Sequence, residues 1–160
     1  NRSGDTLAVG SEHRWNSFSA GFVSRPQSLY TISLSSRYGG YYQQGTLLNV
    51  SSEVGYRFQP YVSLALSSSY NDIRLPKPWN NTRFWLVGPR LDVTMSNKLY
   101  FTGFVQYNEQ SENINVNTRL QWRYKPASDL FIVYTDNYLP APFSVKNRFL
   151  VLKLTYWWNI

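Results

Sequence analysis

The segment from Ile114 to Lys125 restricts the possible folds more than any other part of the chain, because its side chains alternate in character along its whole length. One set is mostly apolar: Ile114, Val116, Thr118, Leu120, Trp122 and Tyr124. The other set is polar or basic: Asn115, Asn117, Arg119, Gln121, Arg123 and Lys125. Successive side chains of a β-strand point to opposite faces. A half-buried strand in a soluble sheet is typically about five or six residues, whereas one that crosses a bilayer at a tilt needs about nine to eleven. The segment therefore predicts a transmembrane β-strand with its apolar side in lipid.

The composition agrees with a membrane protein made of strands. Aromatic residues form 18% of the 160-residue chain, and charged residues only 16%, below the usual quarter. Tyrosine and tryptophan place an apolar ring in lipid and a polar tip among the headgroups, so they concentrate at membrane interfaces. The mean hydropathy of −0.40 does not exclude a membrane protein, because lipid-facing and lumen-facing residues alternate in a barrel.

Several other classes are disfavoured by the sequence. It contains no run of apolar residues long enough for a transmembrane helix. It contains no cysteine, which excludes disulfides and thiolate metal sites, and we predict no cofactor or metal site. The net charge of +7 would suit a nucleic-acid partner, but the basic residues are spread over the predicted strands rather than clustered, so we predict no nucleic-acid role.

The alternation predicts an all-β, antiparallel up-and-down transmembrane β-barrel with about nine strands in this chain. The expected strands are residues 17–22, 29–38, 48–58, 62–70, 85–95, 99–108, 114–125, 130–135 and 148–160. Pro89 falls inside the fifth of them, and proline cannot donate a hydrogen bond to a ladder. We therefore expect a bulge or an unpaired position at Pro89.

The connections between these strands predict how the sheet is oriented. Short turns centre on Pro26, Pro60, Asn97 and Pro126, and longer polar segments alternate with them. In bacterial barrels the short turns are periplasmic and the long loops are extracellular. On this basis residues 1–14 form an extracellular loop and residues 15–160 form the barrel segment.

The odd number of predicted strands indicates whether this chain forms a whole barrel. Bacterial single-chain barrels have even numbers of strands, with both chain ends in the periplasm. If the short turns are periplasmic, the last strand ends correctly at Ile160, but the first strand also runs toward the periplasm. We therefore expect this chain to be the C-terminal part of a larger barrel, completed by upstream residues or by another chain. The alternative is a complete barrel of eight or ten strands.

A set of charged residues is predicted to face the lumen. Its members are Arg37, Glu53, Arg57, Arg90, Asp92, Arg119 and Arg123. A basic lumen would favour anions or bind an acidic plug. The alternative interpretation is that these residues pair across strands and keep the lumen hydrated.

Two aromatic belts are also predicted on the lipid-facing side. The outer belt comprises Trp15, Tyr38, Trp85 and Tyr107, and the periplasmic belt includes Phe22, Tyr56, Phe58, Trp122, Tyr124 and Trp158.

The C-terminus carries the most specific sequence motif. Apolar side chains alternate to the end of the chain at Leu152, Leu154, Tyr156, Trp158 and Ile160. This pattern resembles the C-terminal signal that the barrel assembly machinery of the outer membrane recognises, by strand addition to an exposed edge. The sequence departs from the usual signal by ending in isoleucine rather than phenylalanine. An ordinary amphipathic final strand remains the alternative.

The segments NTRLQWRYKPASDLFIVYTD and KNRFLVLKLTYWWNI resemble the C-terminal end of a family of Bacteroidota envelope proteins. In that family, a periplasmic domain similar to family 9 carbohydrate-binding modules precedes a domain of unknown function expected to be an outer-membrane barrel. The resemblance is strongest over roughly the last 60 residues. It implies a bacterial outer-membrane location and a carbohydrate-binding module upstream of this segment.

The predicted function is non-enzymatic. The segment would close and anchor a larger barrel, as a membrane anchor or scaffold or as a solute passage for an envelope assembly. The expected partners are outer-membrane lipid, the barrel assembly machinery, the remainder of the barrel and an envelope protein complex. Two alternatives remain: a soluble ligand-binding β-barrel, and an outer-membrane hydrolase that would use the single histidine, His13, beside an acid or a serine.

Overall fold

The fold is a single sheet of nine β-strands, seen here in a computed structural model that describes residues 10, 12–42, 44–77 and 79–158. The strands are β1 (Ser17–Val23), β2 (Tyr30–Tyr41), β3 (Gly45–Phe58), β4 (Val62–Arg74), β5 (Thr82–Thr94), β6 (Leu99–Asn108), β7 (Asn113–Lys125), β8 (Ser128–Pro140) and β9 (Phe143–Leu154). The part of the chain that the structure describes includes no helix long and apolar enough to span a membrane.

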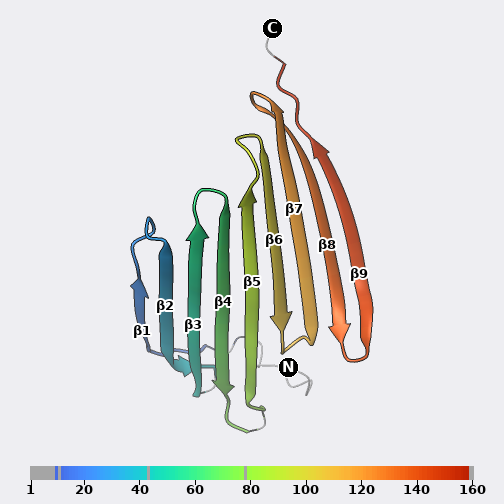
Figure 1. Ribbon diagram of the computed structural model, residues 1–160. Coiled ribbons are helices and arrows are strands. Elements are labelled where there is room, and N and C mark those ends of the chain that lie inside the picture. The colour runs from blue at the N-terminus through green and yellow to red at the C-terminus, as the bar shows by residue number, and fades with distance from the viewer. Residues whose placement is uncertain (1–9, 11, 43, 78, 159–160) are drawn as a thin grey trace.

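Each strand pairs with its neighbours in sequence, and every pair is antiparallel. The order in the sheet is therefore the order in the chain, from β1 at one edge to β9 at the other (Figure 1). The prediction of an all-β, antiparallel, up-and-down sheet with nine strands is confirmed in both topology and strand number. We call the end of the sheet with connections 24–29, 59–61, 95–98 and 126–127 the upper end, and the opposite end the lower end, as drawn in Figure 1.

The register divides the side chains between two faces of different character. Cross-strand partners share a face of the sheet. In the β2–β3 pair, Ile32 is opposite Val54, and in the β3–β4 pair Val54 is opposite Leu66. The same continuity runs through all the pairs, so the apolar sets of the nine strands lie on one side, which we call the apolar face. The other side, the polar face, carries mostly serine, threonine, asparagine and arginine over β2 to β7.

The sheet has no hydrophobic core among the described residues. Large apolar side chains remain open instead, as at Leu34, Leu66 and Leu152, which are 48%, 50% and 66% exposed. Soluble domains bury one face of each sheet against another layer. This single layer therefore needs an apolar medium or a partner on its apolar face.

The predicted contrast between short turns and long loops was wrong. The connections at the lower end cover only residues 42–44, 75–81, 109–112 and 141–142, which are similar in length to those at the upper end. The segments expected to be loops continue the strands, so β9, for example, begins at Phe143 rather than near Arg148. Loop length consequently gives no orientation for the sheet, and residues 1–9 and 11 of the predicted extracellular loop lie outside the described residues.

Asparagine side chains explain why the polar segments at the lower end stay in the ladder. Asn113 and Asn115 both donate to Oδ1 of Asn137, at 3.2 and 2.8 Å, and Asn137 donates in turn to Asn147 on β9. Asparagine is disfavoured in strands when its amide competes with the backbone. Here the amides bond one another across three strands, so the backbone remains free to pair.

Pro89 occupies an unpaired position, as one of the two predicted outcomes. The β5–β6 ladder includes Val87 with Tyr107 and Arg90 with Phe104, but no partners between them. The register is the same on both sides of this gap, so there is no bulge. Pro89 is paired only on the β4 side, where it is opposite Leu66.

Gly88, beside this gap, is in close contact with an aromatic ring. A Cβ at Gly88 would lie 2.9 Å from the Phe104 ring and 3.2 Å from Oγ of Ser67, whose hydroxyl donates to the Gly88 carbonyl. We expect Gly88→Val to lower the free energy of unfolding by about 1–3 kcal/mol, the usual effect of overpacking. The effect should shrink in the Phe104→Ala background. Chemical unfolding in detergent measures both, and equal losses in the two backgrounds would contradict this contact.

The two edges of the sheet run in the same direction. Nine alternating strands make β1 and β9 parallel to one another, and Figure 1 shows both pointing to the upper end. The upper ends of the strands also rise stepwise from the β1–β2 turn to the β7–β8 turn (Figure 1). Such a stagger is what tilted strands of a barrel require.

Candidate functional site

The candidate site is the two faces of the sheet rather than a single cleft. Along the strands, the apolar face divides into regions with different kinds of side chain. Aromatic side chains gather near the upper end of this face: Phe22, Tyr30, Tyr56, Phe58, Trp122 and Tyr124 on the strands, with Tyr156 and Trp158 after the end of β9. Several are in ring contact, such as Tyr30 with Tyr56 at 4.7 Å. We call this set the upper aromatic row.

A second set of aromatic side chains lies near the lower end of the same face. It comprises Phe18, Tyr38, Tyr70, Trp85, Tyr107, Tyr138 and Phe143, which we call the lower aromatic row. The Tyr70 and Trp85 rings are 4.8 Å apart, and Tyr138 stacks on Phe143 at 5.0 Å. Between the two rows the face is mainly aliphatic, with Val54, Leu66 and Leu120 as examples.

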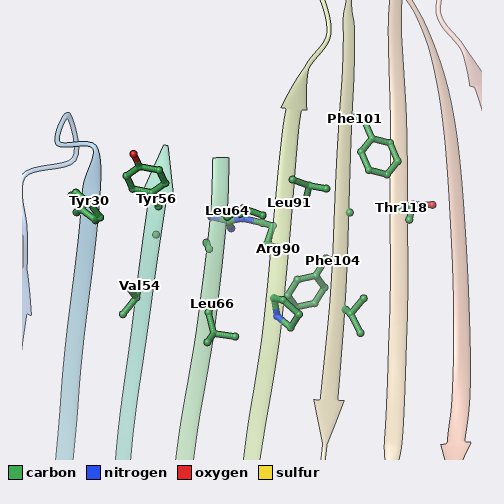
Figure 2. A pocket seen from close by; sticks show the side chains of 15 residues that line it. Tyr30, Val54, Tyr56, Leu64, Leu66, Arg90, Leu91, Phe101, Phe104 and Thr118 are labelled. Atoms are coloured by element: carbon green, nitrogen blue, oxygen red, sulfur yellow. The ribbon is translucent and has the colours of Figure 1, made fainter. Parts of the chain in front are cut away.

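A groove of about 690 Å³ crosses the middle of the apolar face (Figure 2). Its lining runs from Tyr30 on β2 to Thr118 on β7 and includes Pro89 and the small Gly103. Nearly all of the side chains that line it are apolar, as Leu64, Leu66 and Phe101 illustrate. The groove can accommodate a hydrocarbon chain.

One charged cluster interrupts the apolar face at the β8–β9 hairpin. Asp136 is fully buried there, and its Oδ2 accepts hydrogen bonds from Tyr134 and Tyr138 at 2.6 and 2.7 Å. Arg148 on β9 donates to the same oxygen from Nε at 2.8 Å, and its Nη2 also lies 2.8 Å from this oxygen. Burying a carboxylate is tolerated only when it is paired and hydrogen-bonded. The cluster therefore locks β8 and β9 together on a face without other charges nearby.

A second buried carboxylate lies on the same face, outside the lower aromatic row. Asp72 accepts two bonds from Arg74, at 2.9 and 3.1 Å, and Arg83 on β5 is its register partner. Arg74 remains largely exposed. This position, beyond Tyr70 and Trp85, is where charged groups return to the apolar face.

All seven charged residues predicted for the lumen lie on the polar face. The register gives Arg37, Glu53, Arg57, Arg90, Asp92, Arg119 and Arg123 the same side, opposite to the aromatic rows. Arg90 lies 3.8 Å from Glu53 and 3.3 Å from Asp92, and Arg123 lies 3.5 Å from Asp129. The structure thus joins Arg90 to both predicted acids, whereas Arg37, Arg57 and Arg119 make no ion pair with any described residue.

The remaining predicted residues fall at the strand ends. Trp15 precedes β1, and its ring lies 5.0 Å from that of Tyr42. Leu152 and Leu154 close β9 on the apolar face, and Tyr156 and Trp158 follow it with their rings 6.0 Å apart. Ile160, the last residue of the predicted assembly signal, lies outside the described residues.

His13 lies beside Tyr42, with the two rings 5.7 Å apart in an edge contact. Within residues 10, 12–42, 44–77 and 79–158, no group of histidine and acidic residues is placed to hold a metal ion. His13, on which the hydrolase alternative rests, is the only histidine in the sequence.

Sequence reasoning missed the Asp136–Arg148 cluster. Both residues fell in or beside a segment interpreted as a loop, DNYLPAPFSVKN. The available signal was parity: Asp136 continues the even-numbered set of Leu130, Ile132 and Tyr134. On β9 Arg148 likewise continues the even-numbered set of Leu150 and Leu152, because the register shift between Asn137 and Tyr138 displaces only the residues before Asn147.

Comparisons with known proteins find similarity only among solved structures. No protein-family model matches the chain, and no curated protein has a matching sequence. Two solved structures, "KdgM porin" and "KdgM porin in complex with disordered oligogalacturonate", each align with 88% of this chain and 72% of their own at 11% identity and a TM-score of 0.47. At this level the likeness adds nothing to the fold that the ladder defines, and the resemblance to the Bacteroidota family stays a prediction.

Proposed function

We propose that this chain forms part of the wall of a bacterial outer-membrane β-barrel, with its apolar face in lipid and its polar face on a water-filled passage for solutes. In this role it is not an enzyme; it anchors the protein in the membrane and contributes to the passage. The observation that carries the proposal is the single-layer sheet without a hydrophobic core, whose one apolar face is bounded by aromatic rows at both ends.

The spacing of the aromatic rows fits a bilayer. Tyr30 and Tyr38 are eight residues apart on β2 (38 − 30). On β7, Trp122 of the upper row is eight residues (122 − 114) from Ile114, which lies between Tyr107 and Tyr138 of the lower row. At about 3.4 Å per residue this is about 27 Å along the strand. A tilt of about 40° reduces it to about 21 Å, close to the apolar band of about 25 Å in outer-membrane barrels.

The sheet edges support the proposal that more strands complete the wall. Open edges are not tolerated in lipid, because their backbone groups would lack partners. Since β1 and β9 run in the same direction, direct pairing between them would be parallel, and an antiparallel seam needs an odd number of further strands. Nine strands plus an odd number is even, as in bacterial single-chain barrels. Upstream residues or another chain would supply them, and partners in the envelope would dock on the whole barrel.

The final strand supports assembly by the barrel assembly machinery. All of β9 is exposed, and its free edge offers its backbone for strand addition. Leu152 and Leu154 on the apolar face, followed by Tyr156 and Trp158, supply the alternating side chains of the predicted signal.

Cysteine labelling tests which face meets lipid. These 160 residues include no cysteine, so Leu120→Cys and Arg119→Cys each introduce one reporter into this segment, on opposite faces of β7. In vesicles containing the full protein, we expect a charged, membrane-impermeant maleimide to label position 119 and to leave position 120 unmodified. Labelling of both after detergent unfolding is the control for reactivity. Rapid labelling at 120 in intact vesicles would exclude the proposal.

The groove on the apolar face favours a second candidate, a soluble ligand-binding barrel with the apolar face inward. This candidate predicts that the protein stays monomeric without detergent and binds an apolar fluorophore in place of membrane lipid. In the same labelling experiment it predicts that position 119 reacts in buffer without any vesicles. The hydrolase alternative predicts an activity that His13→Ala abolishes.

A further inference from the structure

We propose that the polar face selects anions by means of a basic band near its upper end. The band comprises Arg57, Arg90, Arg119, Arg123 and Lys153. This inference rests on the proposed solute passage and names the class of solute: small anions, such as carboxylates and phosphates, in preference to cations.

The register puts the band within a few residues of one row across the sheet. Arg57 is opposite Ser63, Ser63 opposite Asp92, Asp92 opposite Thr102, and Thr102 opposite Arg119. Arg90 lies two residues before Asp92 of this row, and Arg123 lies four residues after Arg119. The row continues from Arg119 to Val133 and Val151, and Lys153 lies two residues after Val151.

The band follows the stagger of the strands. Arg57 lies one residue from the end of β3, Arg123 two from the end of β7, and Lys153 one from the end of β9. The upper ends rise stepwise from the β1–β2 turn to the β7–β8 turn (Figure 1). Because tilted barrel strands are staggered in this way, residues at the same distance from the strand ends lie at similar depth in the membrane. Arg57, Arg123 and Lys153 would therefore lie at one mouth of the passage. Arg90 and Arg119 lie four and six residues from the ends of β5 and β7, so they extend the basic band from this mouth into the passage.

The acids near the band neutralise only part of it. Arg90 lies near Glu53 and Asp92, and Arg123 lies near Asp129, so three carboxylates accompany five cations. The remaining difference is two positive charges (5 − 3). Arg57, Arg119 and Lys153 form no ion pair with any residue in the described ranges.

The floor beside Arg57 and Arg90 leaves room for an anion. A pocket of about 210 Å³ opens on the polar face there, and Glu53 is its acidic member. Small side chains line it: Thr31, Ser33, Gly55, Ser63 and Ala65. A partly hydrated carboxylate or phosphate can enter between the two guanidinium groups, which bind such oxygens through paired donors.

Rings of arginine and lysine are the usual basis of anion preference in pores, since their potential raises the local anion concentration. The basic band meets this description on one side of the passage.

Reversal potentials across planar bilayers test the inference. The full protein is reconstituted between two KCl concentrations, and we expect a reversal potential of the sign that shows preference for chloride. The double variant Arg57→Gln/Arg119→Gln should lose most of this preference. Glu53→Gln, which removes a carboxylate beside the band, should increase it. Misfolding cannot produce this pair of opposite shifts.

The matched control removes the same charge from the other face. Arg74→Gln/Arg83→Gln takes two positive charges from the apolar face and should leave the reversal potential unchanged. Equal shifts in both double variants would overturn the basic band. A conducting wild-type protein without chloride preference would also overturn it, while leaving the proposed passage intact. A correctly inserted protein that does not conduct would overturn both.

Discussion

Replacing Arg148 by leucine should lower the free energy of unfolding more than removing any other paired charge, because it would leave the buried carboxylate of Asp136 without its cation. Arg148 is the only cation in contact with Asp136 among the described residues, and the Asp136 carboxylate is fully buried. Without the guanidinium, this carboxylate would keep only the hydroxyls of Tyr134 and Tyr138 as donors. Reversible urea unfolding in lipid vesicles, followed by tryptophan fluorescence, measures the change.

The double variant Asp136→Leu/Arg148→Leu separates charge from packing. Replacing both members of such a pair by apolar residues is often neutral or stabilising, so we expect the double variant to be close to the parent in stability. The matched control is Arg123→Leu at the more exposed Arg123–Asp129 pair, which is 3.5 Å apart and should contribute about 1 kcal/mol or less. If the single and double variants at Asp136 and Arg148 lose the same stability, the pair is not the source of the effect.

Placing an arginine in the middle of the apolar face should have the next largest effect. Thr118 lies halfway between Ile114 and Trp122 and lines the groove of the apolar face, so a longer side chain can extend into this groove. In lipid, we expect Thr118→Arg to lower the free energy of unfolding by about 2–4 kcal/mol, the range for arginine at the midplane of a barrel exterior. Thr118→Gln, which changes size without charge, is the reference variant.

The depth of the substitution provides the critical control for this prediction. Ile114→Arg, compared with Ile114→Gln, places the charge in line with Tyr107 of the lower aromatic row, where the difference should fall to about 0–1 kcal/mol. A bilayer produces such a gradient because arginine near the interface reaches the headgroups. Similar differences at 114 and 118 would indicate that the apolar face is buried against protein and not against lipid.

The alternation of apolar and polar side chains was sufficient to predict the topology and the two faces. Segments such as Ile114–Lys125 carry that pattern without interruption, and short-range turns at Pro60 and Pro126 fixed the hairpins. Because a shift of one residue would turn every side chain to the opposite face, the pattern also fixes the register. The grouping of Arg57, Arg90 and Arg119 on one face follows from the same parity.

The strand ends could not be predicted, because their stability depends on partners far away in sequence. Asn115 is a poor strand residue by itself, and its place in β7 is supported by the amide of Asn137 on the next strand. Asp136 has an apolar-face position that no local pattern favours, and Arg148 compensates it from β9. Pairings of this kind form only when two strands are in register, so they cannot be predicted from one segment. The predicted contrast in loop length was wrong for this reason, because these pairings extend the strands into segments that were expected to be loops.

The common direction of β1 and β9 has a practical consequence for protein engineering. Deleting β1 would leave eight strands whose outer members, β2 and β9, run in opposite directions. Those edges are compatible with a closed antiparallel seam, and eight strands enclose an interior just wide enough for side chains to fill. Nine strands therefore form an open wall, whereas the eight strands that remain after removal of β1 could close into a small antiparallel barrel.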